Sequence, residues 1–95
     1  MSDLDRMAAG IEIFPILEDI ERAVAEGNCE ALEFARFRLV AALPELSHRA
    51  SDPVGRALWD LFASSGRWLR QVEGRESGEV HMSVQRAIGL INQSL

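Results

Sequence analysis

The sequence predicts an all-α fold, a small antiparallel four-helix bundle that self-associates. Apolar residues recur every three or four positions along most of the chain, which is the spacing of an amphipathic helix. No segment alternates apolar and polar residues strictly enough to compete as a strand. The helical segments are separated by short connections containing Gly, Pro or Ser, and short connections favour antiparallel neighbours. A fifth, short helix joins the bundle if residues 3–9 are helical.

The length and composition predict one folded domain. Of 95 residues, 47% are hydrophobic and 26% are charged, which is typical of a globular chain. We expect a partly ordered lead over residues 1–10 and one helical domain over residues 11–95. A chain this short hides only roughly 60–70% of its unfolded surface. Its core is therefore thin, and apolar residues left outside it are candidates for contact with another protein.

The first firm helix is predicted from about Phe14 to Glu26. Pro15 fits best in a first helical turn, where its missing amide proton costs nothing, and Gly27 is a typical residue after a helix end. The core-facing stripe of this helix has four members: Ile13, Leu17, Ile20 and Val24.

The second helix is predicted to begin after Asn28, a good N-cap residue. Pro44 should kink it or stop it at Leu43, because a proline ring removes an amide donor and clashes with the preceding turn. Residues 47–51 then form a loop. The predicted core stripe is Leu32, Ala35, Leu39, Ala42, Leu43 and Leu46.

Two further helices are predicted in the second half. Asp52 and Pro53 form a strong start signal for the third, which should run to about Val72. Its stripe is Val54, Leu58, Leu61, Ser65, Trp68 and Val72, thickened by Phe62 and Leu69. A polar connection over residues 73–79 precedes the fourth helix, whose interior Gly89 weakens it. Its stripe is Val80, Val84, Ala87, Ile88, Ile91 and Leu95.

The charge distribution points to a partner with a basic surface. The net charge is −5, and the first fifty residues hold ten acids against five Arg. This balance disfavours nucleic acid, which draws its affinity from Lys and Arg. No apolar run approaches the roughly 20 residues of a membrane span. One Cys cannot form an internal disulfide, so we expect a cytoplasmic protein. Basic residues are all Arg, as in a GC-rich bacterial coding sequence.

No catalytic constellation and no cofactor site is predicted. Cys29 is interpreted as a small half-buried residue, and His81 as a partly buried, hydrogen-bonded one. Arg56, Arg67 and Arg70 share one side of the third helix and are interpreted as a solvated face. The alternative function is metal binding at a subunit interface, because residues 45–48 read Glu-x-x-His. That site would use Glu45 and His48.

The second helix has apolar residues on the side opposite its core stripe. Phe34, Phe37 and Ala41 lie there, and one core cannot bury both sides of a helix unless the helix is central. With Arg38 and Trp59 they are the predicted partner-binding residues, since aromatic and Arg side chains contribute most at interfaces. The predicted function is therefore a non-enzymatic protein–protein interaction module, an adaptor, regulator or immunity-type inhibitor, which is homodimeric through this helix.

Overall fold

The computed structural model describes the backbone of residues 3–46, 53–71 and 76–94, and the side chains of 12–44, 53–71 and 76–93. The described residues form helices and turns, with no strand among them. The helices are α1 (Asp3–Glu26), α2 (Cys29–Leu46), α3 (Pro53–Arg70) and α4 (Gly78–Ser94). The predicted all-α, four-helix fold is confirmed.

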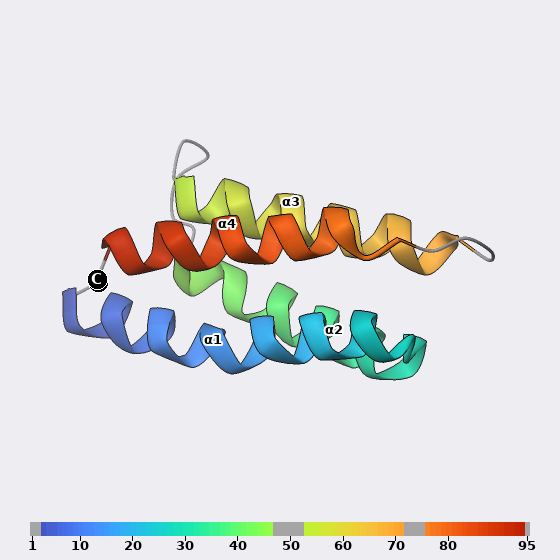
Figure 1. The fold of residues 1–95 in the computed structure, drawn as a ribbon. Helices are drawn as coiled ribbons and strands as arrows, with labels where there is room; N and C mark the ends of the chain where they lie inside the picture. The colour runs from blue at the N-terminus through green and yellow to red at the C-terminus, as the bar shows by residue number, and fades with distance from the viewer. Residues whose placement is uncertain (1–2, 47–52, 72–75, 95) are drawn as a thin grey trace.

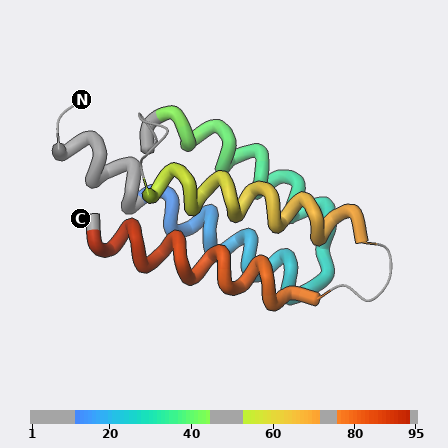
Figure 2. The backbone as a smooth tube through the Cα atoms, turned by 90° about the horizontal axis from the view of Figure 1, so that it is seen from above, coloured from blue at the N-terminus to red at the C-terminus, as the bar shows by residue number. Residues whose placement is uncertain are grey.

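The four helices form two stacked antiparallel hairpins. In Figure 1 the α1–α2 hairpin lies below the α3–α4 hairpin, and successive helices run in opposite directions. Figure 2, seen from above, places α2 and α3 on one side of the molecule and α1 and α4 on the other. Each helix packs on the next in sequence, and α4 also packs on α1. Each helix therefore keeps an outer side that no other helix covers.

The predicted stripes meet in one core between the hairpins. Every stripe residue whose side chain the structure describes is buried, or half-buried and packed against the core. Trp68 is part of this core, as predicted. The most deeply buried large side chains are Ile13, Leu17, Ile20, Leu32, Leu39, Leu58, Leu61, Val80, Val84 and Ile91.

The turn between α1 and α2 follows the predicted signals. Gly27 has φ +68°, a left-handed conformation that glycine adopts without steric cost. Its amide donates to the Val24 carbonyl (3.2 Å), and the Asn28 amide donates to the Ala23 carbonyl (2.8 Å), as in a Schellman motif. Asn28 Oδ1 accepts from the Ala31 amide at 3.0 Å. Asn28 is therefore the N-cap of α2 and fixes how closely α2 follows α1.

The prediction for the start of the first helix was wrong. α1 begins at Asp3 rather than near Phe14, and it contains both Gly10 and Pro15. Residues 3–9 belong to this helix and do not form a separate one. An interior proline costs about 3 kcal/mol. Pro15 is exposed, and its neighbours Ile13 and Ile16 are buried in the core. Burying such side chains contributes roughly 1.5–3 kcal/mol each, which offsets the cost.

The other helix ends differ from prediction by a few residues. α2 continues through Pro44 to Leu46 instead of stopping at Leu43, since a proline near the C-terminal end interrupts few further hydrogen bonds. α3 begins at Pro53 as predicted and ends at Arg70. The predicted cap at Asp52 and the predicted loop over 47–51 lie outside the described residues.

Candidate functional site

The outer side of α2 carries an exposed apolar surface, which we call the α2 face: Phe34, Phe37, Val40 and Ala41. The side chain of Phe34 is 65% exposed, that of Phe37 74% and that of Val40 39%. Ala41 is exposed as well. The opposite side of the same helix packs into the core, with Leu32, Ala35, Leu39 and Leu43 buried there. Of the two arrangements open from the sequence, the enclosed central helix is therefore excluded within one copy of the chain.

Trp59 is an exposed aromatic side chain on α3, the helix that packs beside α2. It is 51% exposed, and its ring meets the Phe62 ring edge to face, with centroids 5.9 Å apart and planes at 88°. The Phe62 ring in turn lies under Arg36 of α2, whose Cζ is 4.1 Å from the ring centroid. Because α2 and α3 are antiparallel, the next turn of α2, with Val40, is level with the turn of α3 that holds Trp59. Trp59 is thus connected to α2 through the Phe62 ring and Arg36.

Arg38 belongs to the edge of the α2 face on the α1 side. Its Nη1 donates to Asp19 Oδ2 at 2.8 Å, and Arg22 Nη1 lies 3.5 Å from the other oxygen of the same carboxylate. A hollow lies between α1 and α2 at this ion pair, and Phe34 is among its lining residues. Arg38 is therefore already held by the chain, and of the five predicted partner-binding residues it is the one with an ion-pair partner among the described residues.

Sequence reasoning missed Arg36, which joins α2 to α3. Its Nε donates to Ser65 Oγ at 3.0 Å, and its Nη2 donates to the Phe62 carbonyl at 3.1 Å. The close approach requires Gly66, because a Cβ there would lie 2.7 Å from Arg36 Nη2. The sequence shows an Arg between the core stripe and the outer side, but its role depends on how α2 packs against α3, which periodicity does not specify.

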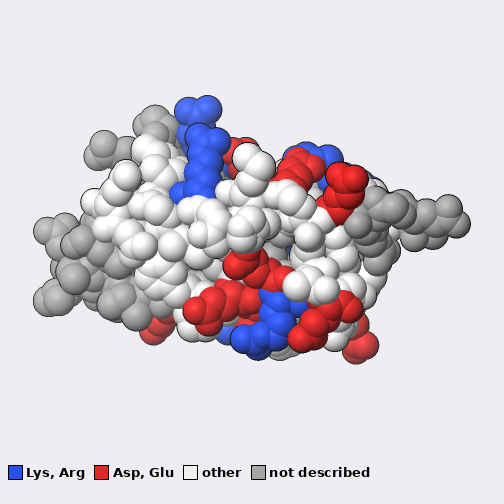
Figure 3. Space-filling model, viewed as in Figure 1, with Lys and Arg blue, Asp and Glu red and all other residues white. Residues whose placement is uncertain are grey.

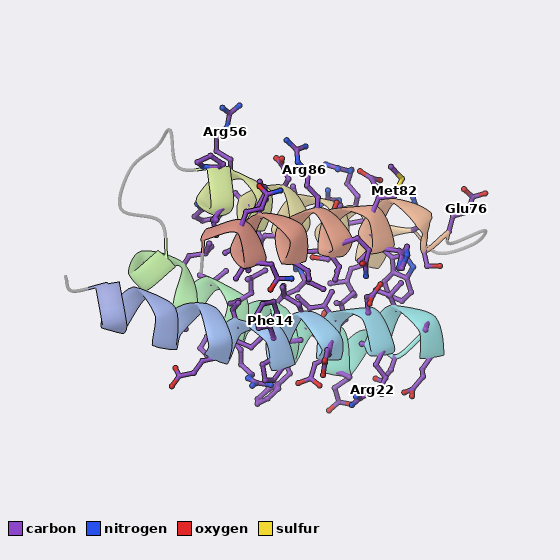
Figure 4. All side chains as sticks on the ribbon, turned by 60° about the vertical axis from the view of Figure 1, so that its left-hand side comes forward. Phe14, Arg22, Arg56, Glu76, Met82 and Arg86 are labelled. Atoms are coloured by element: carbon purple, nitrogen blue, oxygen red, sulfur yellow. The ribbon has the colours of Figure 1, made fainter. Side chains whose placement is uncertain are left out.

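Met82 on α4 is the other large exposed apolar side chain that the sequence did not single out. It is 72% exposed and, as Figure 4 shows, points outward on the side away from the α1–α2 hairpin. No other large apolar side chain of α4 is exposed among the described residues. A single exposed apolar residue is normal for a protein surface, whereas a cluster such as the one on α2 is the kind of patch that often marks an interaction site.

Acidic side chains gather over α1, in the lower part of Figure 3, with basic ones among them. His81 of α4 lies at this side of the molecule, where its Nδ1 pairs with Glu21 Oε1 of α1. The hydrogen bond predicted for His81 is present, but its predicted partial burial was wrong, because the ring is exposed. The acids of the first two helices whose side chains the structure describes are exposed or half-buried: Glu12, Glu18, Asp19, Glu21, Glu26, Glu30 and Glu33.

The three arginines of α3 differ in their surroundings. Arg67 pairs with Glu79 of α4, Arg70 lies near Arg36, and Arg56 points outward in Figure 4. The carboxylate of Glu79 beside Arg67 would repel a phosphate, so the three arginines form a poor common site for one. The interpretation as a solvated face remains the simplest.

No three His, Cys, Asp or Glu side chains that could hold a metal ion gather in the described part of the chain. Cys29 is half-buried and packs against the core, as predicted. His48 and the side chain of Glu45 lie outside the described residues, so the metal hypothesis stays a prediction. Within the same described ranges, no helix combines the length and the hydropathy needed to cross a membrane.

Comparisons of the chain with known protein families, with curated proteins and with solved structures find no match.

Proposed function

We propose that the protein is a non-enzymatic protein–protein interaction module that binds through the α2 face. Its partner is a second copy of the chain, a protein with a basic surface, or both. The single observation that carries the proposal is the exposure of Phe34 and Phe37 on a helix whose other side is buried in the core. An adaptor, regulator or immunity-type inhibitor acts in this way, by occupying a surface on its target.

The free energy available at the α2 face supports binding. An aromatic side chain buries about 150–250 Å² when it is fully covered, and apolar burial contributes about 25 cal/mol per Å². Phe34, Phe37 and Trp59 each expose half or more of their surface. Covering all three side chains therefore contributes several kcal/mol to the free energy of binding, before the cost of association is subtracted. Exposed aromatic clusters of this kind also promote aggregation, so a soluble chain benefits from a partner that covers them.

The acidic side of α1 supplies the second part of the proposal. The chain carries −5, and the exposed acids of α1 would attract a basic partner and raise the rate of encounter. Apolar contact then provides affinity and the carboxylates provide steering. The lone Cys suits a reducing compartment, and we place the module in the cytoplasm.

The experiment compares three baits in lysate from the source cells: the unchanged chain, Phe34→Glu with Phe37→Glu, and Met82→Glu as a matched control. The control introduces one glutamate, against two in the double variant, at an equally exposed apolar position on another helix. Quantitative mass spectrometry should find proteins, including the chain itself, on the unchanged and control baits and not on the doubly substituted one. Equal capture by all three baits would contradict the proposal.

A further inference from the structure

The guanidinium of Arg36 is fixed by α3 and pairs with no carboxylate of the described residues. Its Nε and Nη2 bond to Ser65 Oγ and to the Phe62 carbonyl, and its plane covers the Phe62 ring. No ion pair joins Arg36 to any residue that the structure describes. The nitrogen Nη1 makes none of these bonds, so the guanidinium still has N–H groups that can donate hydrogen bonds at the edge of the α2 face.

The electrostatic surroundings make this cation costly. Burial lowers the pKa of Arg36, the positive charge of Arg70 lowers it further, and Glu33 opposes both. Arg70 likewise forms no ion pair within the described ranges. A half-buried guanidinium beside a second one gains more from a carboxylate than an exposed arginine does, because its solvation is already reduced.

The amount of exposed surface fits a second copy of the chain. Applying the typical areas of these side chains to their exposed fractions gives roughly 450 Å² for Phe34, Phe37, Val40 and Trp59 together. A two-fold dimer would bury this area twice, roughly 900 Å², before its polar rim is counted. Specific interfaces begin at about 1,200 Å² in total. These four side chains thus supply most of a small dimer interface, and a two-fold axis uses the same surface on both copies.

We propose that the α2 faces of two copies pack antiparallel and that Arg36 of each copy pairs with Glu33 of the other. The inference rests on the proposed function, and it specifies the partner and its polar anchor. A two-fold axis centred between Phe34 and Phe37 sets the two aromatic residues of one copy against those of the other. Residue 33 of the second copy then lies level with residue 38, about 3 Å along the axis from Arg36 at 1.5 Å per residue.

Glu33 and Arg36 also lie on the same side of α2, which the proposed pairing requires. Glu33 is exposed, and its charge already acts on Arg36 of its own chain, so the two residues lie near the same edge of α2. A two-fold axis perpendicular to the helices keeps this edge of one copy beside the same edge of the other. The carboxylate of each copy therefore approaches the unused side of the guanidinium in the other, while Ser65 and Phe62 hold that guanidinium in place.

Charge reversal tests the pair. Glu33→Arg and Arg36→Glu each place like charges across the interface, and each alone should weaken dimerisation about tenfold or more in sedimentation velocity. An equimolar mixture of the two variants restores opposite charges at both contacts and should form a heterodimer of near-original affinity. Glu18→Arg, which reverses an exposed acid on α1, is the matched control and should leave the affinity nearly unchanged. A mixture that associates no better than either variant alone would overturn the proposal.

A second design covers the loss of structure that Arg36→Glu could cause. Arg36→Gln removes the charge and keeps a donor, and helix content by circular dichroism reports folding. Dimerisation should weaken about tenfold with Arg36→Gln, and adding Glu33→Gln should then change little, because the pair is already broken. Independent, additive effects would overturn the pairing. If the unchanged chain is monomeric, the inference fails, while capture of other proteins through Phe34 and Phe37 would still support the proposed function.

Discussion

Replacing both exposed phenylalanines by glutamate should abolish association and leave the fold intact. Phe34 and Phe37 expose roughly 130–150 Å² each on a typical phenylalanine area, and covering that area contributes about 3–4 kcal/mol per side chain. Even if imperfect packing and ordering halve the gain, a dimer loses four such contributions. The dissociation constant should therefore rise by about a thousandfold or more.

The same substitutions should not disturb the helix. Both side chains point away from the core, and glutamate is a good helix former. Far-ultraviolet circular dichroism should show unchanged helix content, and light scattering after size exclusion should show a monomer. Met82→Glu serves again as the control and should associate like the unchanged chain. Loss of helix content in the double variant, or association as strong as that of the unchanged chain, would show that these two side chains do not act as an exposed binding surface.

Two further outcomes follow from local geometry, and a third tests the alternative function predicted from the sequence. Gly66→Ala places a Cβ against the guanidinium of Arg36, so the gain of up to about 1 kcal/mol in helix propensity is offset, and thermal stability should change little while dimerisation weakens. Asn28→Ala removes the cap of α2 and should lower the free energy of unfolding by about 1 kcal/mol in urea titrations. Elemental analysis should find no stoichiometric iron, manganese or zinc; a metal that His48→Ala or Glu45→Ala removes would favour the alternative function.

The fold could be predicted because its information is local. The stripes of α3 and α4 and the Gly27–Asn28 turn follow from residue spacing and from the conformational preferences of single residues. The start of α1 could not be predicted in the same way. Pro15 and Gly10 disfavour a helix locally, and only packing against the other helices explains why the helix continues through them.

The candidate site was predictable in part for the same reason. Periodicity alone places Phe34 and Phe37 opposite the core, and the structure finds both exposed. The role of Arg36 was not predictable, because it depends on contacts with Ser65 and the Phe62 carbonyl, 29 and 26 residues away in the sequence. Such contacts depend on which face of α3 packs against α2. Tertiary packing, and not the local sequence, determines that face. The ion pair of Arg38 with α1 is another example.

The α2 face is proposed to be covered by another protein surface, with a second copy as its occupant, so the mass of the unchanged chain in sedimentation equilibrium shows whether that copy binds. The mass should rise with concentration from 10.5 kDa to twice that value. A mass of 10.5 kDa at every concentration, with the fluorescence of Trp59 equally open to aqueous quenchers throughout, would contradict the proposal.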